Sequence, residues 1–177
     1  MSANPNLQAV YAPGRIISSA KFARIASQAG QVVRFLAFGV FAIPEEFRGT
    51  NSPCSTGLLC GWPEPGFNET REFDAAGEAG DRSRLESLLK DGQVCWAELY
   101  VNAFDYKTEI QRKPRDQARI DGSVPPEYLP ALTVAKTRYI FHNKSRRKTS
   151  QSFMHAILRA LAQAEDGIVA NYARPSR

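Results

Sequence analysis

Residues 132–166 read LTVAKTRYIFHNKSRRKTSQSFMHAILRALAQAED, and this stretch decides the predicted fold. Residues 132–142 are rich in β-branched and aromatic side chains, with apolar and polar positions alternating in the second half, which predicts a half-buried strand. Tyr139 and Phe141 are expected to point to one face of this strand and Arg138 to the other.

The second half of the same stretch has the periodicity of a helix. Within residues 149–166, apolar side chains recur every three to four positions, which predicts an amphipathic helix. Thr149 or Ser150 can cap its first turn, and Gly167 stands where a helix commonly ends. The expected core stripe of this helix is Phe153, Ile157, Leu161 and Ala164.

Periodicity and turn residues divide the rest of the chain into further elements. Two short strands are predicted within 7–18, around a Pro13–Gly14 turn, and longer strands at 31–43 and 93–106. Short helices are predicted at 19–29, with Ser19 as the cap, and at 81–90, capped by Asp81. Residues 44–81 are predicted to be a long acidic loop with a short strand near Glu69–Phe73, and residues 108–131 a polar connection.

These elements predict an α+β fold with a mostly antiparallel sheet, two to three helices, a long acidic loop in the middle and a C-terminal helix. The 177 residues suit a single domain spanning 1–177. The longest apolar run, within 32–44, is too short to span a bilayer and is interrupted by Arg34. The first 15 residues lack the pattern of a secretory signal, and three cysteines fit reduced thiols. We therefore expect a cytoplasmic protein without a membrane partner.

Charge is sorted along the chain. Residues 132–177 contain nine Lys or Arg and two acidic residues, whereas residues 45–91 contain ten acidic residues and five basic ones. Residues 1–44 contain four basic residues and no acidic one. A basic strand–loop–helix unit beside an acidic middle segment is typical of a protein with one face for a polyanion.

The basic unit predicts a nucleic-acid-binding surface. Loop residues 142–148 lead into a helix N-terminus, where cationic side chains and free backbone N–H groups favour phosphate. Polar side chains recur every four residues along the helix, opposite its apolar stripe. DNA and RNA, single-stranded or double-stranded, all remain open as partners. The predicted contact residues are Lys136, Arg138, Lys144, Arg146, Arg147, Lys148, Gln151, His155 and Arg159.

A metal-dependent nuclease is the alternative reading. Asp105 and Lys107 have a spacing that places a carboxylate on Mg²⁺ beside a lysine, and Asp91 is a candidate second carboxylate. Glu98 or Glu109 would be a third. Both Asp91 and Asp105 also suit ordinary turn and strand-end positions, so a structural role explains them equally well.

Three weaker patterns complete the alternatives. Residues 23–34 place an alanine and a turn glycine as a helix-turn-helix does, but the following apolar segment suits a core strand better than a recognition helix. Cys54, Cys60, Cys95 and a histidine are too scattered to predict a zinc site. The acidic segment predicts a protein partner or self-assembly, as in an inhibitor that mimics a nucleic-acid backbone.

No sequence motif specifies a reaction. The chain lacks a nucleotide-binding glycine loop, a nucleophile elbow and a metalloprotease motif. We therefore expect no cofactor and no bound metal. The preferred hypothesis is a non-catalytic accessory or structural subunit of a larger assembly that contacts nucleic-acid phosphates.

Overall fold

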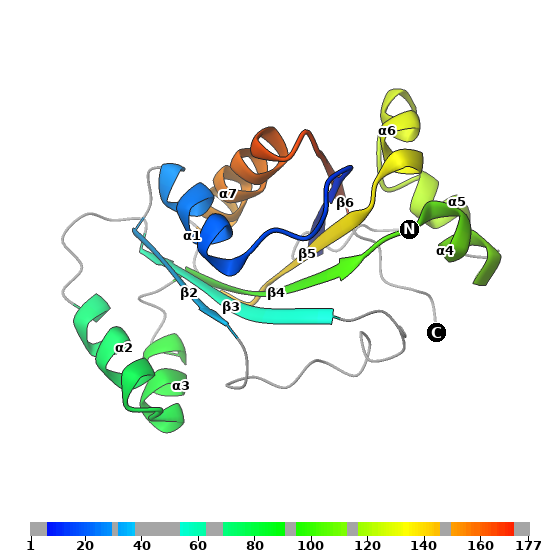
Figure 1. Ribbon diagram of the computed structural model, residues 1–177. Coiled ribbons are helices and arrows are strands. Elements are labelled where there is room, and N and C mark those ends of the chain that lie inside the picture. The colour runs from blue at the N-terminus through cyan, green and yellow to red at the C-terminus, as the bar shows by residue number, and fades with distance from the viewer. Residues whose placement is uncertain are drawn as a thin grey trace.

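One antiparallel sheet of six strands organises the protein (Figure 1). The computed structural model describes residues 7–29, 32–37, 54–62, 69–90, 95–112, 117–145 and 150–171. The strand order across the sheet is β2-β3-β4-β5-β1-β6, and every neighbouring pair is antiparallel. The strands are β1 (Leu7–Ala12), β2 (Val32–Ala37), β3 (Cys54–Trp62), β4 (Cys95–Ala103), β5 (Thr137–Asn143) and β6 (Ile168–Asn171).

The described ranges contain seven α-helices, more than the two to three expected. They are α1 (Ser19–Gln28), α2 (Glu69–Glu78), α3 (Arg82–Lys90), α4 (Tyr106–Arg112), α5 (Gln117–Asp121), α6 (Leu129–Val134) and α7 (Ser150–Ala164). The α+β class and the antiparallel sheet are confirmed. The additional helices are short segments within the two predicted connections.

Two hydrophobic cores lie on opposite faces of the sheet. On one face, α1 and α7 pack side by side over β1, β4 and β5 (Figure 1), where Phe22, Ile157 and Leu161 meet Phe141. On the other face, Leu132 and residues around α4–α6 cover β1 and β5. Burial of apolar surface on both faces is the main stabilising contribution to this three-layer arrangement.

The central strand β5 differs from its prediction. All seven of its residues are buried, because β5 lies between β4 and β1 and has helices over both faces. The strand also begins later than expected, at Thr137. Residues 129–134 form α6 instead, with Pro130 in the first turn, where a fixed φ and a missing N–H suit a helix.

The helices predicted at 19–29, 81–90 and 149–166 are confirmed as α1, α3 and α7, and local hydrogen bonds define the caps of α1 and α3. The Ser18 hydroxyl accepts from the Lys21 N–H at 3.2 Å, so α1 is capped by Ser18 and not by Ser19. The predicted cap of α3 is confirmed, since Asp81 accepts from the Arg84 N–H at 3.0 Å. A side-chain oxygen at this position satisfies a backbone donor that has no partner within the helix.

The end of α7 is shaped by the strand that follows it. Asp166, with φ 49°, takes the left-handed conformation, and the Gly167 N–H donates to the Ala162 carbonyl at 2.8 Å. A Cβ on Gly167 would lie 2.7 Å from the backbone oxygen of Tyr11 in β1. Glycine is therefore required here by close packing against β1. This approach allows β6, which was not predicted, to pair with β1.

The structure differs most from the sequence-based prediction in the two predicted connections, 44–81 and 108–131. The region 44–81 contains β3 and α2, and the strand expected near Glu69–Phe73 is part of α2. Phe73 and Ala76 of α2 are buried, and α2 packs against α3, so tertiary contacts select a helix there. Residues 44–53 and 63–68 of the predicted acidic loop lie outside the described residues, as do residues 38–43 of the strand predicted at 31–43. The region 108–131 contains most of α4, all of α5 and the start of α6.

The helix-turn-helix alternative is wrong. Helix α1 is followed by the strand β2, which pairs with β3, where that motif requires a recognition helix. The N-terminal part of the expected strand at 31–43 is thus confirmed as β2. Only β1 forms within 7–18, and residues 13–18 are a bend and an irregular connection.

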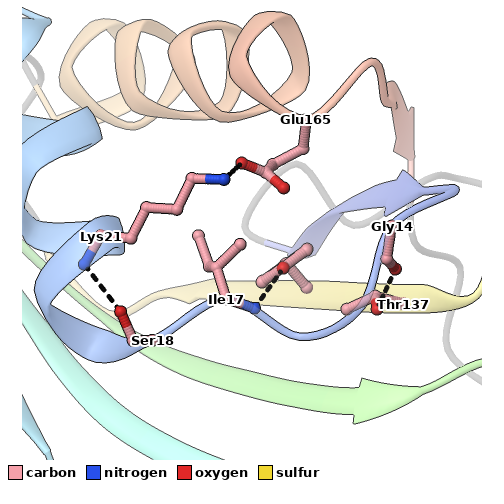
Figure 2. A network of polar contacts seen from close by, with 7 residues as sticks. Gly14, Ile17, Ser18, Lys21, Thr137 and Glu165 are labelled. Atoms are coloured by element: carbon pink, nitrogen blue, oxygen red, sulfur yellow. Dashed lines mark hydrogen bonds and ion pairs between the residues drawn. The ribbon is translucent and has the colours of Figure 1, made fainter.

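Polar contacts fix the connection between β1 and α1 (Figure 2). The Thr137 hydroxyl donates to the Gly14 carbonyl at 2.7 Å, and the Ile17 N–H donates to the Tyr139 hydroxyl at 3.2 Å. Lys21 of α1 forms an ion pair of 2.6 Å with Glu165, just beyond α7. These contacts join the first connection to β5 and to the end of α7.

Candidate nucleic-acid interface

The outer face of α7 is polar and exposed. Gln151, His155 and Arg159 are all exposed, while Phe153 and Ile157 face the core. The four-residue spacing of the polar positions brings them onto one side of the helix. Three of the predicted contact residues therefore share one surface.

Helix α1 extends this surface with further positive charge. Within α1 and α7 the ionisable residues are Lys21, Arg24, His155 and Arg159, and neither helix contains an acidic residue. Arg24 and Arg159 are exposed. Because the two helices lie side by side (Figure 1), their outer faces form one layer without internal negative charge, which we call the α1–α7 layer.

Among the described residues of α1, α7 and their ends, acidic side chains occur only after the last residue of α7. Glu165 directly follows α7, and its carboxylate pairs with Lys21 at 2.6 Å (Figure 2). Its side chain is 8% exposed. Lys21 is therefore engaged in a structural ion pair, and Arg24 and Arg159 are the stronger candidates for an external anion.

His155 is held by a neighbour on the sheet. The side-chain amide of Gln8 in β1 donates to the Nε2 of His155 at 3.1 Å, on the exposed side of the structure. This contact joins α7 to β1 and fixes the ring beside the basic face.

Arg138 lies inside the protein and not on its surface, contrary to the expectation from sequence. It is 5% exposed, and its Nε donates to the Oδ1 of Asn102 at 3.2 Å. Its guanidinium also lies 3.6 Å from Glu109 and 5.4 Å from the centre of the Phe104 ring. These contacts attach α4 to the sheet, so Arg138 has a structural role.

Tyr139 is also buried, and so does not extend the exposed surface. Its hydroxyl accepts from the Ile17 N–H (Figure 2). Burial raises the pKa of Tyr139, the hydrogen bond from Ile17 opposes that shift, and the nearby Glu165 charge adds to it. The net effect keeps the hydroxyl neutral.

Lys136 and Lys144 lie at opposite ends of β5. Lys136 is exposed and precedes the strand, whereas Lys144 follows it. The seven residues of β5 lie between them, so eight extended steps of about 3.3 Å place their Cα atoms about 26 Å apart. These two lysines therefore do not form one compact site with the start of α7.

Lys144 belongs to a polar cluster on the sheet face opposite α7. Its Nζ lies 3.3 Å from the Oε2 of Glu98 in β4. The Tyr100 hydroxyl donates to the same oxygen at 2.8 Å, and the Nδ1 of His142 lies 3.6 Å away. We call Glu98, Tyr100, His142 and Lys144 the Glu98 cluster.

The Glu98 cluster keeps its carboxylate ionised. Burial alone would raise the pKa of Glu98, but His142, the Tyr100 hydroxyl and the positive charge of Lys144 together hold that pKa below its usual range. The contact with His142 is longer than an ordinary hydrogen bond, so the imidazole acts on the carboxylate from a distance. Opposite charge and hydrogen-bond donors thus outweigh desolvation.

Glu98, His142 and Lys144 were predicted in unrelated roles, and Tyr100 was not predicted as a site residue. The register of β4 and β5 brings them together, because Glu98 is directly opposite His142. A register between strands 44 residues apart is not readable from local periodicity.

The nuclease alternative has no support from the residues that the structure describes. Asp105 is exposed and accepts from the Thr108 N–H at 2.7 Å, as a cap of α4. Hydrogen bonds from Thr108 lower the pKa of Asp105. Lys107 is exposed, and Asp91 lies outside the described residues, as do Arg146, Arg147 and Lys148.

The same part of the chain offers no cluster of three or more His, Cys, Asp or Glu side chains placed to hold a metal ion. Cys95 is buried in the core between the sheet and the two helices α1 and α7. Within these ranges, too, no helix is long and apolar enough to cross a membrane.

Comparison with known proteins gave no match to this chain, whether with protein-family models, with curated proteins or with solved structures.

Proposed function

We propose that this protein binds nucleic acid through phosphate contacts made by the outer face of the α1–α7 layer. The single observation that carries the proposal is the exposed polar face of α7 beside α1, with basic side chains and no acidic residue in either helix. Cationic and amide side chains on an exposed face are the usual partners of phosphate oxygens.

The basic segment between β5 and α7 supports the same proposal from the sequence. Arg146, Arg147 and Lys148 directly precede the helix that presents Gln151, His155 and Arg159. A positive segment followed by a helix N-terminus is a favourable combination for an anion.

The proposed role is that of an accessory or structural subunit in the cytoplasm, because phosphate contacts alone require no catalytic group. A protein partner for the acidic segment is a second part of this proposal. Its described acidic side chains include Glu72 and Asp74 on α2 and Asp81 before α3. Such a partner would present a basic surface.

Fluorescence anisotropy with labelled single-stranded and double-stranded DNA and RNA tests the proposal. Binding should weaken as salt rises from about 50 to about 200 mM, with a linear relation between the logarithms of affinity and salt concentration. Replacing Arg146, Arg147 and Lys148 together by Ala should flatten that slope by roughly two to three units. An unchanged slope in the triple variant would remove this segment from the interface, and an unchanged slope after replacing Arg24 and Arg159 by Ala would contradict the proposal.

A further inference from the structure

The α1–α7 layer is two helices wide. Helices α1 and α7 lie side by side on one face of the sheet, and buried side chains such as Phe22 and Ile157 attach both of them to it (Figure 1). Packed helices have axes about 8–10 Å apart, and each helix with its side chains is about 10–12 Å across. The layer therefore presents a surface about 20 Å wide.

This width keeps the layer out of the grooves of a duplex. The major groove of B-form DNA is about 12 Å wide and accepts a single α-helix. The major groove of an RNA duplex is deep and narrow. Because α1 flanks α7, the two helices together are too wide to enter either groove. A duplex placed on the layer therefore meets it with its backbone, and the edges of its bases stay out of reach.

The outer face of α7 carries a regular row of hydrogen-bonding side chains. Four residues of an α-helix advance about 6 Å, so the row extends for about 18 Å. Its exposed members are Gln151, His155, Arg159 and Gln163. Arg24 is exposed on the neighbouring helix. Guanidinium and amide groups donate to phosphate oxygens whatever the base sequence is.

The positions of these side chains are fixed by contacts at the edges of the layer. Lys21 of α1 pairs with Glu165 beyond the end of α7 at 2.6 Å (Figure 2). Gln8 of β1 is hydrogen-bonded to His155 at 3.1 Å. A rigid set of donors suits a ligand whose phosphates also have fixed positions, as in a duplex. A flexible single strand would lose conformational entropy on matching them.

The aromatic rings of the two helices stabilise the core. Phe22 of α1 and Phe153 of α7 are 3% and 2% exposed, and neither helix contains Tyr or Trp. The imidazole of His155 is engaged by Gln8. Proteins that bind single strands obtain much of their affinity by stacking bases on exposed aromatic side chains. The exposed side chains of this layer instead suit contacts with phosphates.

We propose that the α1–α7 layer binds double-stranded nucleic acid through its phosphate backbone, without reading the base sequence. This inference rests on the proposed function and narrows its partner to a duplex. The width of the layer directs it to the backbone, the row on α7 supplies the donors, and the burial of Phe22 and Phe153 leaves no platform for unpaired bases on these two helices.

Fluorescence anisotropy with labelled probes of equal length tests the choice of a duplex. At low salt a DNA duplex should bind about tenfold or more tightly than either of its single strands. An RNA duplex and its single strands form a second pair of probes and distinguish DNA from RNA as the source of the backbone. Tighter binding of at least one duplex than of its strands supports the inference.

Selection from a pool of DNA duplexes with a randomised central sequence tests the absence of base readout. Sequencing of the bound fraction should show no enriched sequence. A protein that reads bases prefers its site by about 10³-fold or more, so an enriched motif would be evident and would overturn the inference.

The double variant Arg24→Ala, Arg159→Ala connects the preference with the layer. Both side chains are exposed, so the variant should fold. It should bind the duplex more weakly, and its preference for the duplex over single strands should shrink. Arg71→Ala, exposed on α2, is the control and should keep the full preference. A full preference in the double variant would place the duplex on another surface and overturn the inference.

The outcomes separate this inference from the function on which it rests. Absence of binding by the unsubstituted protein to any probe at low salt overturns both. Salt-dependent binding that is weakened in the arginine double variant, but is as tight for single strands as for duplexes, overturns only the choice of a duplex.

Discussion

The Nζ of Lys144 lies 3.3 Å from the Oε2 of Glu98, on the face of the sheet opposite α7. A lysine predicted from sequence to contact phosphate is therefore paired with a carboxylate in the free protein. The Glu98 side chain is only 13% exposed, so its negative charge requires a nearby positive charge or hydrogen-bond donors. This relationship fixes Lys144 to the sheet on the face away from the α1–α7 layer.

Glu98 should make stability depend on pH. Its folded-state pKa is depressed, so its stabilising contribution is present above the unfolded pKa, near the ordinary value of 4.5, and is lost as the pH falls through the folded value. The free energy of unfolding should drop more between about pH 6 and about pH 3 for the unsubstituted protein than for Glu98→Gln. Urea unfolding at the two pH values measures this difference, and equal drops would contradict the assigned shift.

Arg138 should be important for stability. Replacing it by Ala leaves Asn102 and Glu109 without their partner in a mostly buried setting, and we expect a loss of about 2 kcal/mol or more. Lys136→Ala, at an exposed position, should change the free energy of unfolding by less than about 0.5 kcal/mol. Chemical denaturation of both variants tests the contrast. Similar small effects would place Arg138 outside the core.

Gly167 should tolerate no side chain. A Cβ there would lie 2.7 Å from the Tyr11 carbonyl, so Gly167→Ala must displace backbone between β1 and β6, at a cost of about 1–3 kcal/mol. At Gly14 the nearest atom to an added Cβ is 3.8 Å away, so Gly14→Ala serves as a control with little effect. Thermal unfolding distinguishes them, and equal melting temperatures would refute the close approach.

Asp105 should act as a helix cap and not as a metal ligand. Asp105→Ala should destabilise the protein by about 1 kcal/mol, whereas Asp105→Asn, which keeps a capping oxygen, should retain most of the stability. Incubation with labelled nucleic acid and Mg²⁺ should give the same result for both variants as for the unsubstituted protein. Metal-dependent cleavage that disappears in Asp105→Asn would restore the nuclease alternative.

Local periodicity was sufficient for the regular, amphipathic elements of this fold. The apolar stripe through Phe153 and Ile157 located α7, and the cap at Asp81 located the start of α3. Periodicity failed for β3, whose sequence CSTGLLCGW contains two glycines and has weak strand propensity. Pairing with β2 and β4 on either side stabilises β3, and a single sequence does not reveal such long-range contacts.

In the proposed interface, too, local spacing predicted some features, and others depended on long-range contacts. The exposed face of α7 was predicted, since it depends only on helical spacing. The burial of Arg138 was not, because charge alone suggested solvent exposure. Its burial depends on partners from β4 and α4, Asn102 and Glu109, which lie 36 and 29 residues away. The alternation of side chains along β5 places Lys144 beside Glu98, on the sheet face opposite α7.

The most direct test of the account is the salt dependence of nucleic-acid binding by the double variant Arg24→Ala, Arg159→Ala, measured by fluorescence anisotropy. Both arginines are exposed in the α1–α7 layer, and Arg71→Ala, exposed on α2, is the control. We predict weaker binding and a slope flatter by up to about two units for the double variant, with no change for Arg71→Ala. An unchanged slope in the double variant, or an equal loss in the control, would contradict the proposed surface.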